Sequence, residues 1–589
     1  MAPPLRQRLT LDVFRRRLAN VDALPQLATL AVLTGLATGT VILLFRFLIE
    51  QGMAGLLLGG DSENFEALAP EHRLLLVVAG SLLLGAVLTR LGSTTRRVGV
   101  VHVMERLSRH QGHLPLKNLL VQFLGGVIAI GTGQSGGREG PSIHLGAGTA
   151  SLLGQSFGLP NNSLRVLIAC GTAAAIASSF NTPMAGVIFA MEVVMMEYTI
   201  GSFIPVILAA VTSTLMTHYF LGSEPAFTIA PLQQESLLET PFIIFAGLLI
   251  GAIAAAYIAL VQQFASLSKW PFWVRALIAA LVTGMLALGV PQIMGIGYDT
   301  VSAAMLGQLG FATLLLIVVA KLVSSAAASG LGMPVGLIGP TLVIGACVGG
   351  LLAQLGHRFD PAIMSSDGFY VMLGMSAMMA AVLQAPLAAL VSVLELTANP
   401  NVILPAMLII VVATMTTSEL FGSRGVFLRT LSTLGLEYPP SPVTQHLQRV
   451  GVTALMDRSF VRLPVASTRE QCSAALADNP RWVLCQDEDG TIRAMLDAAD
   501  LRVQLDASAE AEPEAKAPEA DDTLNLLEIP GMRRDVADVD DRATLQQAQE
   551  AMATSSAEAV CVRRQSAPLI RPVIGVLTRN QIINYRELG

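Results

Sequence analysis

Long apolar runs separated by short polar breaks fill the chain from about residue 24 to residue 435. The first run, Leu24 to Ile49, follows five arginines and has no small-residue cleavage site, so it is predicted to be a retained membrane helix. Those arginines place the N-terminus in the cytoplasm by the positive-inside rule. Later runs such as 184–196 and 386–396 are shorter than the about 20 residues that a spanning helix needs. We therefore expect several broken or re-entrant helices.

The apolar region contains an internal repeat. Residues Cys170–Glu192 align without a gap on Leu373–Glu395, with a proline and a glutamate at matching places in both. Upstream, Gly137–Gly146 aligns on Gly336–Gly345, again without a gap. In transporters built from such repeats, the binding site lies where the two repeats meet, near the membrane midplane. The sequence thus predicts an all-α, multi-pass membrane domain made of two repeated units.

A polar tail follows from about Tyr438, with short alternating runs that favour β-strands. Its middle part is rich in Ala, Glu and Pro and has nothing to bury, so it is predicted to be a disordered linker. The expected domains are a cytoplasmic N-terminal segment (1–23), a membrane transport domain (24–435), a first tail module (436–505), the linker (506–522) and a second tail module (523–589).

Composition narrows the class of protein. Of the 589 residues, 53% are hydrophobic and 14% are charged, and the mean hydropathy is +0.60, which excludes an ordinary soluble enzyme. The five cysteines are scattered without a CxxC, so neither a disulfide framework nor a metal site is expected. The net charge of −6 comes without a basic tract, so no nucleic-acid partner is expected. No nucleophile and base stand together as an enzyme needs, and no cofactor is expected.

One carboxylate stands out between the apolar runs. Glu139 lies in the glycine-rich stretch Gly131–Gly146, and an acid at membrane depth suggests a pathway for ions or protons. The alternative is a solvated acid in a loop outside the bilayer. The stretch contains a GxGxxG, but it follows a long apolar run rather than a strand and has no ribose-binding acid about 20 residues further on. A dinucleotide site is therefore rejected.

Helix starts offer an anion site that needs no full positive charge. The first backbone N–H groups of a helix lack partners and lie at the positive end of its dipole. Pro141 and Pro340 suit the first turns of two such helices. A carboxylate there could occupy the anion's position when ionised and leave it when protonated. The candidate anion-binding residues are Gly137, Arg138, Gly140, Gly336, Leu337, Ile338 and Gly339.

The sequence resembles the CLC family of voltage-gated chloride channels and chloride/proton antiporters. The resemblance rests on Gly137–Pro141, Cys170–Glu192 and Gly336–Pro340 and covers roughly residues 25–435. It implies inverted-topology repeats, a homodimer with one chloride pathway per subunit, and a multi-pass protein of the inner (plasma) membrane with both termini cytoplasmic. It also implies that Glu139 is the gating glutamate, which carries the proton in the antiporters.

Three departures from the family pattern concern the central anion. Val98 stands where the family has a pore serine, and Phe427 where it has a pore tyrosine. The phenylalanine common in the second repeat is replaced by Ile338. These changes leave the Leu337 and Ile338 amides as donors, so we expect weaker anion binding and softer chloride selectivity.

A fourth departure concerns protons. Antiporters of the family typically carry an inner glutamate where this chain has Val193, and many channels have valine there. The sequence therefore leans towards a chloride channel, with a chloride/proton antiporter as the alternative. Glu192 or Glu197 could relay protons instead. Glu192 is more readily explained as a structural acid that caps helix ends, because Glu395 matches it in the second repeat.

The tail resembles the paired CBS modules attached to many CLC proteins. Asp500 and Thr578 are candidate contacts for an adenine nucleotide, but Gln581 replaces the ribose-binding acid in the second module. A structural role and ligand sensing are both open, and a nucleotide-sensing membrane protein is a more distant alternative function. His102 and His144 fall near the pathway and are interpreted as packed residues rather than metal ligands.

Overall fold

The computed structural model describes residues 11–19, 23–56, 64–223, 227, 234–360, 363–433, 435–436, 438, 441–510, 523–564 and 571–588. The chain divides into two compact units. The membrane unit consists of Leu27–Phe157 and Leu164–Pro439. The tail unit consists of Pro440–Gly589 together with Met1–Gln26 and Gly158–Ser163.

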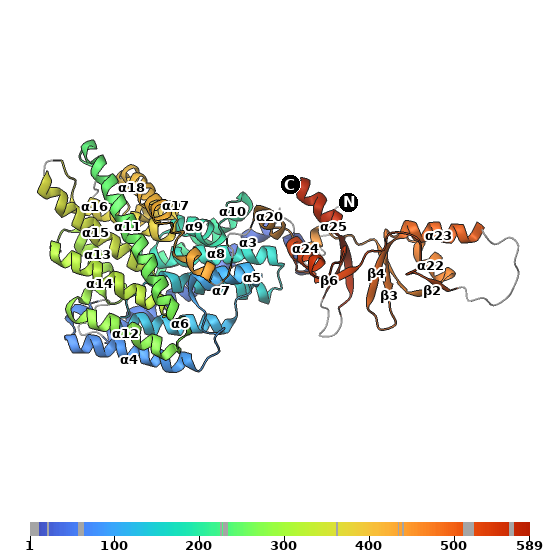
Figure 1. Ribbon diagram of the computed structural model, residues 1–589, viewed down its shortest axis with the longest axis horizontal. Helices are drawn as coiled ribbons and strands as arrows, with labels where there is room; N and C mark the ends of the chain where they lie inside the picture. The colour runs from blue at the N-terminus through green and yellow to red at the C-terminus, as the bar shows by residue number, and fades with distance from the viewer. Residues whose placement is uncertain are drawn as a thin grey trace. The chain divides into compact units, whose positions relative to one another are not determined.

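The membrane unit is all helical (Figure 1). Within the described residues, nine helical stretches are long and apolar enough to cross a membrane. Others, including α9 and α17, are shorter, as the sequence predicts. The α-helices that lie wholly or mostly in this unit are α3 (Leu24–Leu56), α4 (Pro70–Thr89), α5 (Gly99–Arg109), α6 (Leu116–Gly131), α7 (Glu139–Ser156), α8 (Asn161–Phe180), α9 (Pro183–Phe189), α10 (Ile200–Leu221), α11 (Thr240–Ala265), α12 (Phe272–Gly289), α13 (Tyr298–Met305), α14 (Phe311–Gly330), α15 (Ile338–Phe359), α16 (Asp367–Leu383), α17 (Pro386–Thr397), α18 (Ile403–Met415) and α19 (Val426–Thr433).

Local backbone geometry repeats between the two halves. After α6 and α14 the chain turns at Gly133 and Gly332, whose φ angles are +83° and +82°, a region that favours glycine. Before α9 and α17 the left-handed residues are Asn181 and Gln384, with φ +61° and +55°. The sequence repeat is therefore a repeat of structure, down to single turns.

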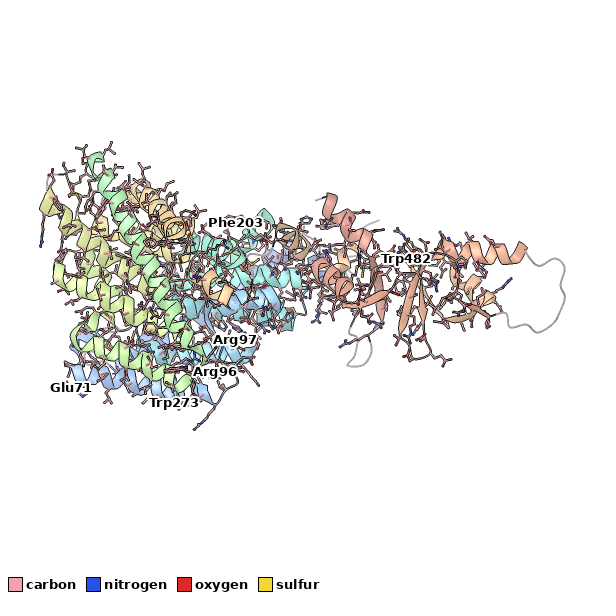
Figure 2. The ribbon with its side chains drawn as sticks, in the orientation of Figure 1. Glu71, Arg96, Arg97, Phe203, Trp273 and Trp482 are labelled. Carbon is pink, nitrogen blue, oxygen red and sulfur yellow. The ribbon has the colours of Figure 1, made fainter. Side chains whose placement is uncertain are left out.

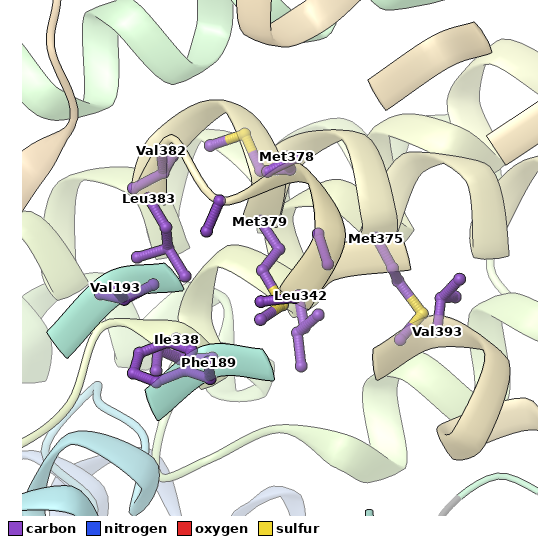
Figure 3. Packing of buried hydrophobic residues seen from close by; sticks show 14 of the residues in the cluster. Phe189, Val193, Ile338, Leu342, Met375, Met378, Met379, Val382, Leu383 and Val393 are labelled. Carbon is purple, nitrogen blue, oxygen red and sulfur yellow. The ribbon is translucent and has the colours of Figure 1, made fainter. Parts of the chain in front are cut away.

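Small residues bring the helices of each half together. A Cβ added at Gly146 in α7 would overlap the carbonyl oxygen of Gly171 in α8, and one at Gly345 in α15 would overlap that of Gly374 in α16. Contacts this close are typical of membrane helices, where small residues let the backbones approach. The core beside these contacts is apolar, and Figure 3 shows Phe189, Ile338 and residues of α16 packed within it.

The tail unit contains two similar modules. In the first, β1 (Phe460–Pro464) pairs in parallel with β3 (Trp482–Gln486), which pairs antiparallel with β4 (Ile492–Asp497). In the second, β6 (Val536–Asp540), β7 (Ala559–Arg563) and β8 (Val573–Thr578) pair in the same way. The remaining elements are α2 (Leu11–Leu18), α20 (Pro442–Gln448), α21 (Val452–Leu455), β2 (Ala466–Thr468), α22 (Arg469–Leu476), α23 (Ala498–Glu510), β5 (Thr523–Asn525), α24 (Leu545–Thr554) and α25 (Arg579–Leu588).

The two modules share an apolar cluster. Trp482, labelled in Figure 2, and Met495 of the first module pack with Cys561 and Val576 of the second. The linker expected at 506–522 begins later than the sequence suggests, because α23 continues to Glu510. Alanine and glutamate are good helix formers, so the start of this segment extends the preceding helix. Residues 511–522 lie outside the described part of the chain.

Candidate functional site

Two helix starts from the two repeats meet back to back. Gly137 N donates to Gly336 O and Gly336 N donates to Gly137 O, both at 2.7 Å, and α7 and α15 begin two residues later at Glu139 and Ile338. A Cβ at Gly140 would lie 2.8 Å from the Gly336 Cα, so the approach needs glycine. The two positive helix ends are thereby held beside each other.

The Glu139 carboxylate lies between these helix starts and is fully buried. Its Oε2 accepts a hydrogen bond from Gly339 N at 3.0 Å, and its Oε1 accepts one from the Tyr298 hydroxyl at 2.6 Å. A Cβ added at Gly137 would overlap Oε2, so the carboxylate rests against that glycine. This burial excludes the solvated loop acid considered from the sequence. The carboxylate occupies the kind of position that helix-start amides offer to an anion.

Arg138 belongs to a charged network beside the carboxylate. Its guanidinium donates to Glu50 at 3.1 Å and to the Ser179 carbonyl at 3.2 Å, and it lies 5.7 Å from the centre of the Tyr298 ring. Glu50 also accepts from Arg46 at 3.4 Å. The network ties α3 to the start of α7.

The remaining candidate anion residues lie around the two helix starts. Leu337 is the half-buried residue before α15, and Ile338 is buried at its first position. Val98 is half-buried before α5, which packs against both α7 and α19. Phe427 of α19 is buried in the same apolar cluster as Ile338. Val98, just before α5, and Phe427, on α19 that packs against α5, therefore both carry apolar side chains where the family has hydroxyl groups.

The inner relay position is apolar and tightly packed. Val193 lies in a π-helical turn (Ala190–Met195) that continues α9, and it is buried. Figure 3 shows it near Phe189 and Ile338. A cavity of about 10 Å³ adjoins Ile338, and its lining includes Thr182 and Ser392. That is roughly the space one water molecule needs.

Glu192 and Glu395 each cap the start of a helix in the other repeat. Glu192 accepts from Leu387 N at 3.2 Å and Ala388 N at 2.7 Å, at the start of α17. Glu395 accepts from Met184 N at 3.0 Å and Ala185 N at 2.7 Å, at the start of α9. The contacts are those that a structural acid in both repeats would make.

Sequence reasoning treated the histidines separately, but the structure pairs them. His102 Nδ1 of α5 and His144 Nε2 of α7 lie 2.9 Å apart and are buried, so one nitrogen donates and the other accepts. Their places in two different helices gave no signal of this contact. In the described part of the chain, no cluster of three or more His, Cys, Asp or Glu side chains suits a metal ion.

Tyr298 and Lys321 were also missed from the sequence. Lys321 of α14 is fully buried and donates to the carbonyls of Ile293, Gly295 and Ile296 at 3.0 to 3.2 Å. It thereby fixes the loop that leads to Tyr298. A lone lysine inside an apolar run was a visible signal, because such a charge needs a specific set of partners.

The candidate nucleotide residues lie in different tail modules. Asp500 lies in the first turn of α23, against Gly531. Thr578 precedes α25 and forms a capping box with Gln581: Thr578 N donates to Gln581 Oε1 at 2.8 Å, and Gln581 N donates to Thr578 Oγ1 at 3.4 Å. Gln581 therefore has a structural role where the first module has its acid.

Comparisons with known proteins point to one family. A family model described as "Voltage gated chloride channel" matches residues 80–418. The chain is 30% identical over 414 residues to a "chloride channel protein ClcB-like" of Ralstonia nicotianae, which covers 68% of this chain and 96% of the relative. It is 29% identical over 325 residues to the "H(+)/Cl(-) exchange transporter ClcA" of Yersinia pestis, covering 53% of this chain and 68% of the relative.

Solved structures share the fold. A slow cyanobacterial Cl⁻/H⁺ antiporter matches with a TM-score of 0.62 at 23% identity and covers 69% of this chain and 97% of its own. A eukaryotic CLC transporter matches with a TM-score of 0.56 at 19% identity and covers 97% of this chain and 98% of its own, so the fold similarity extends into the tail. Together with the buried carboxylate between two helix starts, these matches show that the chain belongs to the CLC family of voltage-gated chloride channels and transporters.

Proposed function

We propose that this CLC-type anion transporter exchanges chloride for protons and that Glu139 is both its gate and its proton carrier. The observation that carries the proposal is the buried Glu139 carboxylate, which takes the Gly339 amide at the junction of the two helix starts. The relatives named as H⁺/Cl⁻ exchange transporters support the same function.

The geometry suggests how gate and proton are linked. An ionised Glu139 competes with an anion for the backbone donor of Gly339. A protonated carboxyl is a weaker acceptor and gives up that donor more easily. One proton taken up at Glu139 would thus free the Gly339 amide for an anion, and release of that proton would let the ionised carboxylate accept the amide again.

This proposal corrects the lean towards a channel. Val193 favoured a channel, but the exchange transporters among the relatives and the antiporter among the solved structures fit the alternative better. Glu192 is engaged by two amides of α17, so we do not assign it the inner proton step. The small cavity beside Ile338 could instead hold a water that passes the proton inward.

A channel stays a second candidate because of Val193. Flux in proteoliposomes under a chloride gradient, with pH recorded, distinguishes the two. Exchange predicts that the chloride gradient drives protons against their own gradient. A reversal potential at the chloride value without proton movement would establish a channel and reject exchange.

The proposal also covers the oligomeric state, the membrane location and the role of the tail. We expect a homodimer in the inner (plasma) membrane with both termini in the cytoplasm. The tail is proposed to be a CBS pair. It either binds an adenine nucleotide near Asp500 and Thr578 or has a purely structural role. Equilibrium dialysis of the full-length protein with ATP, ADP and AMP separates these: binding at millimolar levels favours sensing, and its absence favours the structural role.

A further inference from the structure

Tyr298 reaches the gating carboxylate from a third element. It is the first residue of α13 and follows Gly297, whose φ of +88° turns the chain into that helix. Its hydroxyl donates to Glu139 Oε1 at 2.6 Å, while Gly339 N donates to Oε2 at 3.0 Å. The two oxygens of the carboxylate are therefore held by two different parts of the membrane unit.

The tyrosine ring is held by its neighbours. Phe180 lies 6.1 Å away between ring centres, Phe227 meets the ring edge-on at 5.6 Å, and the Arg138 guanidinium lies over it at 5.7 Å. Aromatic and cation–π contacts of this kind favour particular ring orientations. The hydroxyl is thus aimed at the carboxylate by packing rather than by chance.

The backbone before the ring is also anchored. Lys321 donates to three carbonyls of the loop that precedes Gly297, those of Ile293, Gly295 and Ile296, and its burial makes these hydrogen bonds costly to break. A donor on such a loop keeps its place when the carboxylate leaves. This is what a fixed latch requires.

We propose that Tyr298 is a positioning residue that acts as a latch: its hydroxyl holds the Glu139 carboxylate in its seat, the position against Gly137 and Gly339. In this way Tyr298 sets the pH at which the gate opens. The inference rests on the proposed role of Glu139. A phenol that donates to a carboxylate stabilises the ionised form and strengthens its hold on the seat. When the carboxylate takes a proton from solution, it becomes a poorer acceptor for the phenol, so the latch weakens in the same step. Protonation forms one O–H bond on the carboxyl group and weakens the hydrogen bonds from both Tyr298 and Gly339.

Other charges surround the latch and would remain after the hydroxyl is removed. They come from α3, α7, α13 and α14: Arg46, Glu50, Arg138, Asp299 and Lys321. Arg46 and Arg138 are both paired with Glu50, whose negative charge offsets part of theirs. Removing only the hydroxyl of Tyr298 therefore isolates its contribution.

The test is the pH dependence of anion turnover in proteoliposomes for the wild type and Tyr298→Phe. The variant is expected to reach half-maximal turnover about one pH unit higher, the shift that corresponds to one typical hydrogen bond. Tyr370→Phe is the matched control, because the Tyr370 hydroxyl also donates to a buried carboxylate, Glu239, at 2.6 Å. It should leave the pH profile unchanged.

A second variant keeps the aromatic ring and is expected to shift the pH of half-maximal turnover in the opposite direction. Fluorotyrosine at position 298 is a more acidic donor and is expected to move the midpoint to lower pH, which a general packing defect would not do. An unchanged midpoint in both variants, or an equal shift in Tyr370→Phe, would overturn the latch. Absence of exchange in the wild type would instead reject the proposed function.

Discussion

The membrane unit and the tail are each built from two similar halves, and in each an acid is present in only one half. Glu139 matches Ile338 in the membrane unit, and Asp500 matches Gln581 in the tail, three residues after the last strand residue. The membrane acid is fully buried on the other half's backbone. In the tail, the second module has Gln581 in place of the acid, and its side chain caps the start of α25.

The difference lies in what surrounds each position. Glu139 accepts the Gly339 amide, which lies in the first turn of α15 and has no partner within that helix, so the acid completes a site made by both halves. Gln581 completes the capping of its own helix, as Gln471 and Gln547 do elsewhere in the tail. In the membrane unit the unmatched acid accepts a backbone N–H group of the other half, whereas in the tail Asp500 only lies against Gly531 of the second module.

The largest expected effect comes from filling the seat of the carboxylate. Gly137→Ala places a methyl group where Glu139 Oε2 lies, and overpacking typically costs about 1–3 kcal/mol. We expect chloride turnover to fall about ten- to a hundredfold in flux assays. Gly131→Ala is the control, since a Cβ there meets no other group within 4 Å. Equal turnover in both variants would contradict the close fit of the seat.

The reciprocal caps test the symmetry of the frame. Glu192→Ala and Glu395→Ala each leave two helix-start amides without their acceptor, so each should lower the free energy of unfolding by about 1–3 kcal/mol. Thermal unfolding in detergent measures this. Proton coupling in transport assays should survive in both. If Glu192→Ala alone abolished coupling, Glu192 would be a relay rather than a cap.

Much of this arrangement could be predicted from the sequence. The matched prolines and glutamates revealed the repeat, and the resemblance identified Glu139. Contacts between distant segments could not be predicted: Tyr298 lies 159 positions from Glu139, and His102 lies 42 from His144. The hydrogen bond from Gly339 N to Glu139 forms only because the fold brings the two helix starts together, and a single sequence carries no signal of that contact. The relatives named as exchange transporters and the antiporter among the solved structures fit the chloride/proton antiporter better than the channel that Val193 favoured.

Restoring hydroxyls should strengthen the anion site by a moderate amount. Val98→Ser and Phe427→Tyr return the donors that the family pattern has, and one net hydrogen bond contributes about 1 kcal/mol, or about fivefold in affinity. Calorimetry of chloride binding to each variant measures the gain. A wild-type affinity already equal to that of relatives with both hydroxyls would disprove the expected weakness.

The smallest effect belongs to the tail. Gln581→Ala removes one arm of the capping box of α25 and should cost about 0.5–1 kcal/mol of tail stability. Hydrogen exchange of the α25 amides in the full-length protein reports the loss. Anion turnover should not change, and a large change would mean that the tail position acts on transport after all.

The central claim is that the Glu139 carboxylate is the gate and the proton carrier of this pathway, and Glu139→Gln tests it most directly. Chloride and proton fluxes of the variant and the wild type are measured together in proteoliposomes under a chloride gradient. The account predicts that chloride flux persists, loses its pH dependence and no longer drives protons. Flux that stayed gated and proton-coupled as in the wild type would contradict it.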